Sequence, residues 1–357
     1  MKYKFKTTVL LIVTFIFSNP IYSQTQNPWV NEVFNNIINA IGNYSINAPN
    51  LEIVPDGRKM AYLSPKKQTI FIDQQVLDIC RKYGKDSSNT LAFLLGHELT
   101  HHYMGHSWIT KDDKSDYKGF SFMENIKYFN KDSTKRLEME TQADLKGGFY
   151  SFLGGYDALN PAIRLLDTLY VVYKVPKAAS GYPNLSERKS ICETQIKKLE
   201  RLKSIFNAST YALMAGYYQG AEDGFNKILS EGFNSREIYN NLGLTYLLHA
   251  LKEMDNKEIL AYPFEYDAKS RLNDVSTRGG ISSYTNSGQI KMLIDNAIKK
   301  FQHAKRLDPD YKSAQLNICC AYSLLAELYA KDESENEKYI KKALDALDSY
   351  NMPEMKN

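Results

Sequence analysis

Apolar side chains recur at helical spacing in several separate stretches of the chain. Between residues 27 and 50 the spacing predicts an amphipathic first helix, which we expect to pack on a core; its apolar face comprises Val30, Val33, Phe34, Ile37, Ile38 and Ile41. The mostly apolar residues 91–99 predict a buried helix, and the polar residues 86–89 just before it offer capping groups. From about residue 200 the pattern changes to a succession of helices.

The helices of the C-terminal part repeat a residue pattern. A tetratricopeptide repeat of about 34 residues, set on Ala221 and Phe225, places an aromatic residue near Tyr239, where one stands. The first-helix positions of the next unit are Tyr239, Leu242, Gly243 and Tyr246, and the second-helix positions are Ala297, Phe301, Ala304 and Pro309. A third unit begins at 317–322. Polar interruptions are expected between Leu251 and Gln289 and at 331–338, both on one edge of the array. This edge either meets a partner or the preceding domain, or consists of connectors without a binding role.

The N-terminus has the pattern of a cleaved secretory signal peptide. A basic start at residues 1–6 precedes an apolar run, Val9–Phe17, and the small residue Ser23. The run is too short to span a bilayer, and no cysteine follows it for lipid attachment. We therefore expect 1–23 to be removed, and the mature chain to be exported, periplasmic or secreted, with no transmembrane segment.

Charge and length bear on the class of partner and on the number of domains. Loss of Lys2, Lys4 and Lys6 with the signal peptide lowers the formal net charge from +4 to +1. No run of Lys and Arg interleaved with aromatics remains, which argues against nucleic acid and leaves proteins as partners. Of the 357 residues, those after 23 are enough for two domains, predicted at 24–200 and 201–357. The four cysteines are too few and scattered for a disulfide framework.

The buried helix predicted at 91–99 contains an H-E-x-x-H motif. His97 and His101, four residues apart, stand one helical turn apart on one face and can bind one metal ion. Glu98 lies beside that face and can act as a general base on water. On a continuing helix, His102 and His106 would point roughly 140° and 180° away from His97, so we interpret both as polar helix positions.

A tetrahedral zinc site with one open position needs a third protein ligand. The helical segment 136–148 supplies Glu140 and, one turn later, Asp144. Glu140 can bind the metal while Asp144 hydrogen-bonds the far nitrogen of a ligating histidine. Glu138 is the rival ligand, but it has no acidic residue four positions later, so we favour Glu140. Alternatively, Glu140 and Asp144 belong to a solvated acidic helix face that binds no metal.

These two motifs, H-E-x-x-H followed by E-x-x-A-D, resemble those of the gluzincin metallopeptidases of the HtpX and BepA type, the family that includes the CAAX prenyl proteases. The resemblance covers roughly residues 30–200 and implies an α+β peptidase domain with a small sheet. Within it, 60–64 and 68–73 look like two short strands, and Val76 and Leu77 look like the start of a helix. Residues 154–166 look like the family's glycine-tyrosine-aspartate helix entry.

The chain departs from the family at one motif. In the family, the His of a His-Pro pair usually stabilises the oxyanion, and an Arg five residues after the proline closes the site. Here Tyr182 precedes Pro183, and Arg188 is the arginine. Tyr182 is either an oxyanion donor through its phenol or an ordinary tyrosine beside a proline turn. Arg188 matches the motif directly.

The sequence thus predicts a mainly α protein: a gluzincin domain followed by an all-α tetratricopeptide-repeat solenoid. The predicted function is that of an exported zinc metalloendopeptidase, with one Zn²⁺ on His97, His101 and Glu140, acting on protein substrates in envelope quality control and using its repeats to recruit substrate or a partner. Two alternatives remain: a zinc-binding repeat scaffold or chaperone-like adaptor without turnover, and a structural module in which the motif binds no metal.

Overall fold

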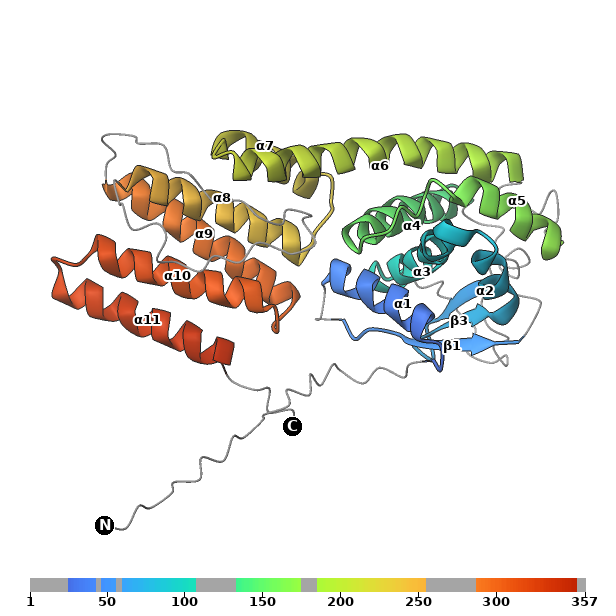
Figure 1. Cartoon of the computed structure of the whole chain (residues 1–357), viewed down its shortest axis with the longest axis horizontal. Helices are drawn as coiled ribbons and strands as arrows, with labels where there is room; N and C mark the ends of the chain where they lie inside the picture. Colours follow the sequence, from blue (N-terminus) through green and yellow to red (C-terminus); the bar gives the residue numbers. More distant parts are fainter. Residues whose placement is uncertain are drawn as a thin grey trace, which may run out of the picture.

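The structure is a computed structural model that describes residues 25–42, 46–55, 60–106, 133–174, 185–254 and 287–351. It is mostly helical, with a small sheet (Figure 1). The signal peptide predicted at 1–23 and Tyr182 lie outside the described residues, as does most of the segment between Leu251 and Gln289. None of the described helices is long and apolar enough to cross a membrane.

The described residues up to 174 form the sheet and five α-helices. These helices are α1 (Pro28–Ile41), α2 (Gln74–Arg81), α3 (Ser87–Tyr103), α4 (Ser133–Leu153) and α5 (Ala162–Val172), with a short 3-10 helix at Gly84–Asp86. The apolar face predicted for the first helix is buried: Val30 and Ile37 are both 0% exposed and lie in the same core as α3 and α4. This confirms the predicted packing of α1.

The sheet has three strands in the order β1-β3-β2, formed by β1 (Asn50–Val54), β2 (Ala61–Ser64) and β3 (Thr69–Asp73). The central strand β3 pairs in parallel with β1 and antiparallel with β2, so that Ile70 stands opposite both Leu51 and Leu63. The strands expected near 60–64 and 68–73 are therefore confirmed, and β1 is an addition. As an edge strand, β2 keeps one row of backbone groups available to α3.

The described residues from 185 onward form six helices: α6 (Leu185–Met214), α7 (Tyr218–Ser230), α8 (Arg236–Glu253), α9 (Ser287–Leu307), α10 (Lys312–Leu328) and α11 (Glu333–Asn351). They pack in sequence-adjacent pairs, α6 with α7, α8 with α9 and α10 with α11. Of the residues set on second-helix positions, Ala221, Phe225, Ala297 and Phe301 are fully buried, whereas Pro309 is exposed. The tetratricopeptide assignment rests on the residue pattern and stays a prediction.

The long helix α6 belongs to both halves. It lies across α4 and α5 at one end of the molecule and pairs with α7 toward the other (Figure 1). The boundary predicted between residues 200 and 201 falls inside this helix. One continuous cluster of buried apolar residues runs from Val30 in α1 to Tyr339 in α11, so the core does not break at that boundary.

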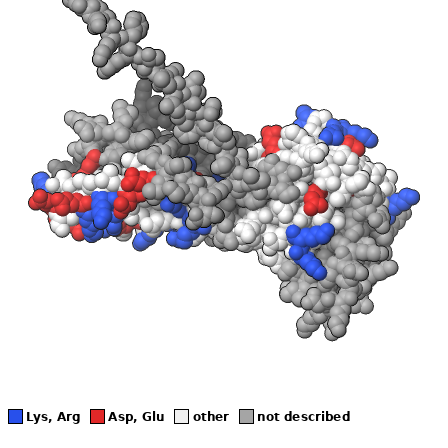
Figure 2. All heavy atoms as spheres, turned by 90° about the horizontal axis from the view of Figure 1, so that it is seen from below, with Lys and Arg blue, Asp and Glu red and all other residues white. Residues whose placement is uncertain are grey.

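The interruption expected at 331–338 is wrong in most of its length, because α11 already begins at Glu333. Asp332 explains the start: its carboxylate accepts a hydrogen bond from the backbone N–H of Glu335 at 3.2 Å, as a helix cap does. Glu333 and Glu335 lie in the first turn, where the helix dipole favours negative charge. Acidic and basic side chains are interspersed over this end of the molecule (Figure 2).

Candidate metal centre

The candidate site forms where α3 and α4 cross. Gly96 and Gly147 allow the two backbones to touch: a Cβ added at Gly147 would lie 2.6 Å from the carbonyl oxygen of Gly96 and 2.8 Å from the amide nitrogen of His97. Ser151, further along α4, donates to the carbonyl of Ala92 at 3.2 Å. This close contact brings the motif of α3 next to the acidic residues of α4.

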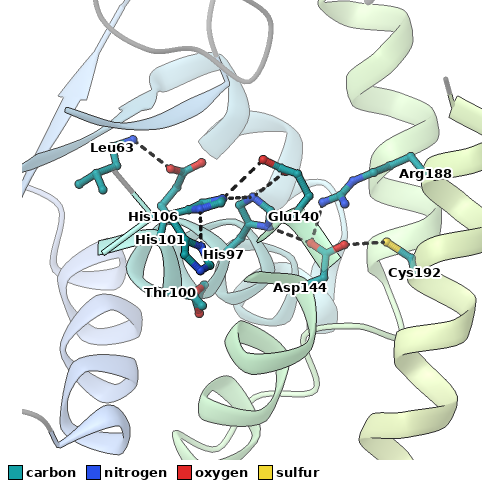
Figure 3. A network of polar contacts seen from close by, with 11 residues as sticks. Leu63, His97, Thr100, His101, His106, Glu140, Asp144, Arg188 and Cys192 are labelled. Carbon is teal, nitrogen blue, oxygen red and sulfur yellow. Dashed lines mark hydrogen bonds and ion pairs between the residues drawn. The ribbon is translucent and has the colours of Figure 1, made fainter. Parts of the chain in front are cut away.

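Three side chains converge in the space between these helices (Figure 3). The Nε2 atoms of His97 and His101 are 3.0 Å apart, and the carboxylate of Glu140 lies 3.3 Å from the first and 3.7 Å from the second. One ligand atom from each residue lies within 4.8 Å of the others, an arrangement that can hold a metal ion. Glu138, the rival ligand, is exposed on α4 and outside this cluster.

The donor set fits zinc. Two imidazoles and one carboxylate are ligands of catalytic zinc sites that keep a fourth position open. The side-chain atom Oε2 of Glu140 is buried and makes no hydrogen bond among the described residues. A buried carboxylate oxygen is costly unless a cation satisfies it; this oxygen lies 3.3 Å from Nε2 of His97, so a protonated His97 or a metal ion in its place can offset that cost.

Asp144 contacts His97 at Nδ1, the ring nitrogen that faces away from His101 and Glu140. Its Oδ1 lies 2.8 Å from Nδ1 of His97 and accepts a 2.6 Å hydrogen bond from Nη2 of Arg188. Its Oδ2 accepts a weaker bond from the thiol of Cys192 at 3.7 Å. The structure therefore places Arg188, 1% exposed, against Asp144, and its side chain also lines a pocket beside His97 and Glu98.

Glu98 points toward the edge strand. Its Oε2 accepts a hydrogen bond from the backbone N–H of Leu63 in β2 at 2.9 Å. Burial raises the pKa of Glu98 to about 7, with the positive charge of His97 acting in the opposite direction. A carboxylate with a pKa near neutrality is suited to both taking and returning a proton.

The other ionisable groups have pKa values that depend on one another. Burial disfavours a charge on His97, but Asp144 and Glu140 outweigh it and raise the pKa of His97 to about 10. Burial and the charge of His97 lower the pKa of His101 to about 3. Burial raises the pKa of Glu140, yet the contact with His97 reverses this and holds it below its ordinary value. Without a metal ion, the cluster is thus a buried imidazolium between carboxylates.

His106 departs from its sequence-based interpretation. The helix does not continue through it: α3 ends at Tyr103, and Gly105, at φ 62°, reverses the chain. The amide of Gly105 bonds the carbonyl of His102, and the amide of His106 bonds that of His101, the pattern of a Schellman cap. Nδ1 of His106 consequently lies 3.0 Å from Nδ1 of His101, and its Nε2 lies 2.7 Å from Oε1 of Gln142.

The glycine at 105 was the signal in the sequence that could have predicted this turn. His102 does stay outside the cluster, with its Nε2 2.7 Å from the carbonyl oxygen of Asn47. No sequence pattern pointed to Gln142, Cys192 or the backbone of Leu63, because each reaches the site from another element.

Comparison with known proteins supports the same chemistry. Residues 24–123 match the family model described as Peptidase family M48. Peptidases of family M48 are zinc metallopeptidases, which makes this part of the chain similar to a metallopeptidase domain and consistent with the HtpX and BepA type. The match covers less than a third of the chain, includes His97, Glu98 and His101, and ends before Glu140. No curated protein and no solved structure matches.

Proposed function

We propose that this protein is an exported zinc-dependent metalloendopeptidase that hydrolyses peptide bonds in protein substrates. The observation that carries the proposal is the convergence of His97, His101 and Glu140 within 4.8 Å, with Glu98 beside them. The similarity of residues 24–123 to peptidases of family M48 supports it independently.

Each residue of the site has a defined part in this chemistry. His97, His101 and Glu140 would hold a zinc ion, which would supply Lewis acidity to a bound water and to a peptide carbonyl. Glu98, fixed by Leu63 and with a pKa of about 7, takes a proton from water and later delivers it to the leaving amine. Asp144 orients His97, and Arg188 balances the buried charge of Asp144. Tyr182 is proposed as the oxyanion donor from the motif alone.

The cellular setting is also part of the proposal. The basic and apolar start of the chain supports export, with residues 1–23 removed. The helix pairs from α6 to α11 support a module that holds a protein substrate or partner close to the site, as tetratricopeptide repeats do. Quality control of envelope proteins is the function that combines these features.

The deciding experiment is zinc content. Residues 24–357, purified and dialysed, are expected to contain about one zinc per chain, and a Glu140→Gln variant much less. A matched Glu138→Gln variant, changed at the exposed neighbour, is expected to retain the metal. If the parent protein contains no zinc even after zinc is added back, the peptidase proposal fails and a repeat scaffold remains.

A further inference from the structure

Side chains of helix α4 approach the Nδ1 side of both His97 and His101, one directly and one through another side chain. Asp144 reaches Nδ1 of His97 directly (Figure 3). Gln142 instead contacts Nε2 of His106, and Nδ1 of His106 contacts Nδ1 of His101. We propose that His106 and Gln142 are positioning residues that fix the tautomer of His101, so that its Nε2 carries a lone pair toward the metal position. This inference rests on the proposed zinc site and adds two residues to it.

The hydrogen bonds from Gln142 through His106 to His101, called the relay below, fix which ring nitrogen carries the proton. With the amide of Gln142 oriented as in this structure, its oxygen Oε1 faces Nε2 of His106 at 2.7 Å and can only accept, so Nε2 carries the proton. In a neutral His106 ring, Nδ1 is then the acceptor. Because Nδ1 of His101 lies 3.0 Å from it, that nitrogen must be the donor, and Nε2 of His101 is left without a proton.

The other side of the cluster agrees with this assignment. The carboxylate of Asp144 requires a proton on Nδ1 of His97, which directs Nε2 of His97 toward Nε2 of His101 and Glu140. Both histidines therefore present the same nitrogen to the same space. If the amide of Gln142 were reversed, its NH2 group would donate to His106, every step would invert, and His101 would carry its proton where a metal ion has to bind.

The fold makes the relay possible at the end of α3. Gly105 turns the chain back so that His106, five residues after His101, lies against it instead of pointing away. His106 is 7% exposed, which limits competition from water. Gln142 is exposed on its outer side, so residue 142 can be changed with little effect on packing.

The test changes the hydrogen-bonding character of residue 142. Gln142→Glu keeps an acceptor and Gln142→Lys offers only donors; Thr141→Glu and Thr141→Lys introduce the same charges one residue away. The dissociation constant for zinc is measured by chelator competition in all four variants and the parent, and the melting temperature of each zinc-free variant checks folding. We expect Gln142→Lys to bind zinc at least about tenfold more weakly than Thr141→Lys, and Gln142→Glu to stay close to Thr141→Glu.

The tautomer is read separately in the zinc-free protein. With six histidines in the chain, ¹⁵N-histidine labelling resolves each ring by NMR, and the parent is expected to show the proton of His101 on Nδ1. A proton on Nε2 of His101, or equal zinc binding by Gln142→Lys and Thr141→Lys, would overturn the relay. If the parent binds no zinc, the proposed function fails on its own account, and the ¹⁵N shifts still decide the inference.

Discussion

At the residue scale, the site is a set of ionisable side chains that determine one another's charge. His97, Glu98, His101 and Glu140 are each between 6% and 8% exposed, and Asp144 is 1% exposed. Buried charges of this kind are stable only when they are paired or bind a metal ion. Two predictions follow from the individual groups.

Glu98→Gln separates catalysis from metal binding. The amide keeps the shape of the side chain but cannot accept a proton from water, so peptide hydrolysis is expected to fall about 10²- to 10⁴-fold while zinc content stays at the parent level. Hydrolysis of an unfolded protein and zinc per chain are measured on the same preparation. A cellular phenotype that Glu98→Gln leaves unaltered would instead favour the scaffold without turnover.

The affinity for zinc is expected to rise with pH between 8 and about 10. In the zinc-free protein the pKa of His97 is raised to about 10, so below that pH a proton occupies the nitrogen that zinc needs. Each pH unit toward 10 should then strengthen zinc binding about tenfold, and binding should release about one proton. Working above pH 8 keeps Glu98, with its pKa of about 7, ionised throughout.

Calorimetry in buffers of different ionisation enthalpy counts the released protons. His102→Gln, changed at the neighbouring histidine that contacts Asn47 instead, should behave as the parent does. Zinc affinity that does not change over this pH range would show that His97 is neutral in the zinc-free protein.

At the element scale, the site depends on how closely α3 approaches α4. A Cβ at residue 147 would meet backbone atoms of Gly96 and His97, which cannot rotate away as a side chain can. Gly147→Ala is therefore expected to lower the free energy of unfolding by about 1–3 kcal/mol and to weaken zinc binding, since the ligands of the two helices would separate.

Gly220→Ala in α7 provides the control. The atoms nearest to its Cβ would belong to the ring of Tyr217, a side chain that is 66% exposed and can rotate toward solvent, so the free energy of unfolding should stay the same or rise. Urea unfolding and zinc competition measure both variants. Unchanged zinc affinity in Gly147→Ala would show that α3 and α4 can shift without loss of the site.

At the scale of the whole molecule, the loop between α7 and α8, residues 231–235, contacts α4, the helix that contains Glu140. Lys146 of α4 donates to the carbonyl of Gly232 at 2.9 Å, and Tyr150 donates to that of Asn234 at 3.1 Å. Between them, Phe233 is 2% exposed and its ring centroid lies 4.8 Å from that of Phe149. The two halves therefore share a core next to the site.

Phe233→Ala is expected to cost about 3–5 kcal/mol of unfolding free energy, because it leaves a cavity between the halves. The unfolding of α1 and the loss of total helix should then occur at different denaturant concentrations. Fluorescence of Trp29 follows α1 in a Trp108→Phe background, which removes the second tryptophan of the chain, and circular dichroism follows total helix. Tyr217→Ala, which removes an exposed ring from the same half, should change stability by less than about 0.5 kcal/mol. Coincident transitions in Phe233→Ala would contradict coupling through this residue.

The sequence by itself determined the local elements and the residues of the motif. Helical periodicity is a property of neighbouring residues, so it indicated α1, α3 and the succession of helices after residue 200. The spacing of His97 and His101, and that of Glu140 and Asp144, fixes which side chains share a helix face. These patterns were enough to propose a zinc site before any contact was known.

Only the tertiary structure decided how the elements meet. It placed the partner of Arg188 at Asp144, turned His106 back onto His101, and continued α6 across the predicted domain boundary. It also joined α4 to the loop after α7. The physical reason is that these contacts link residues far apart in the chain or depend on one backbone turn, and hydrophobic periodicity carries no information about which distant surfaces pack together.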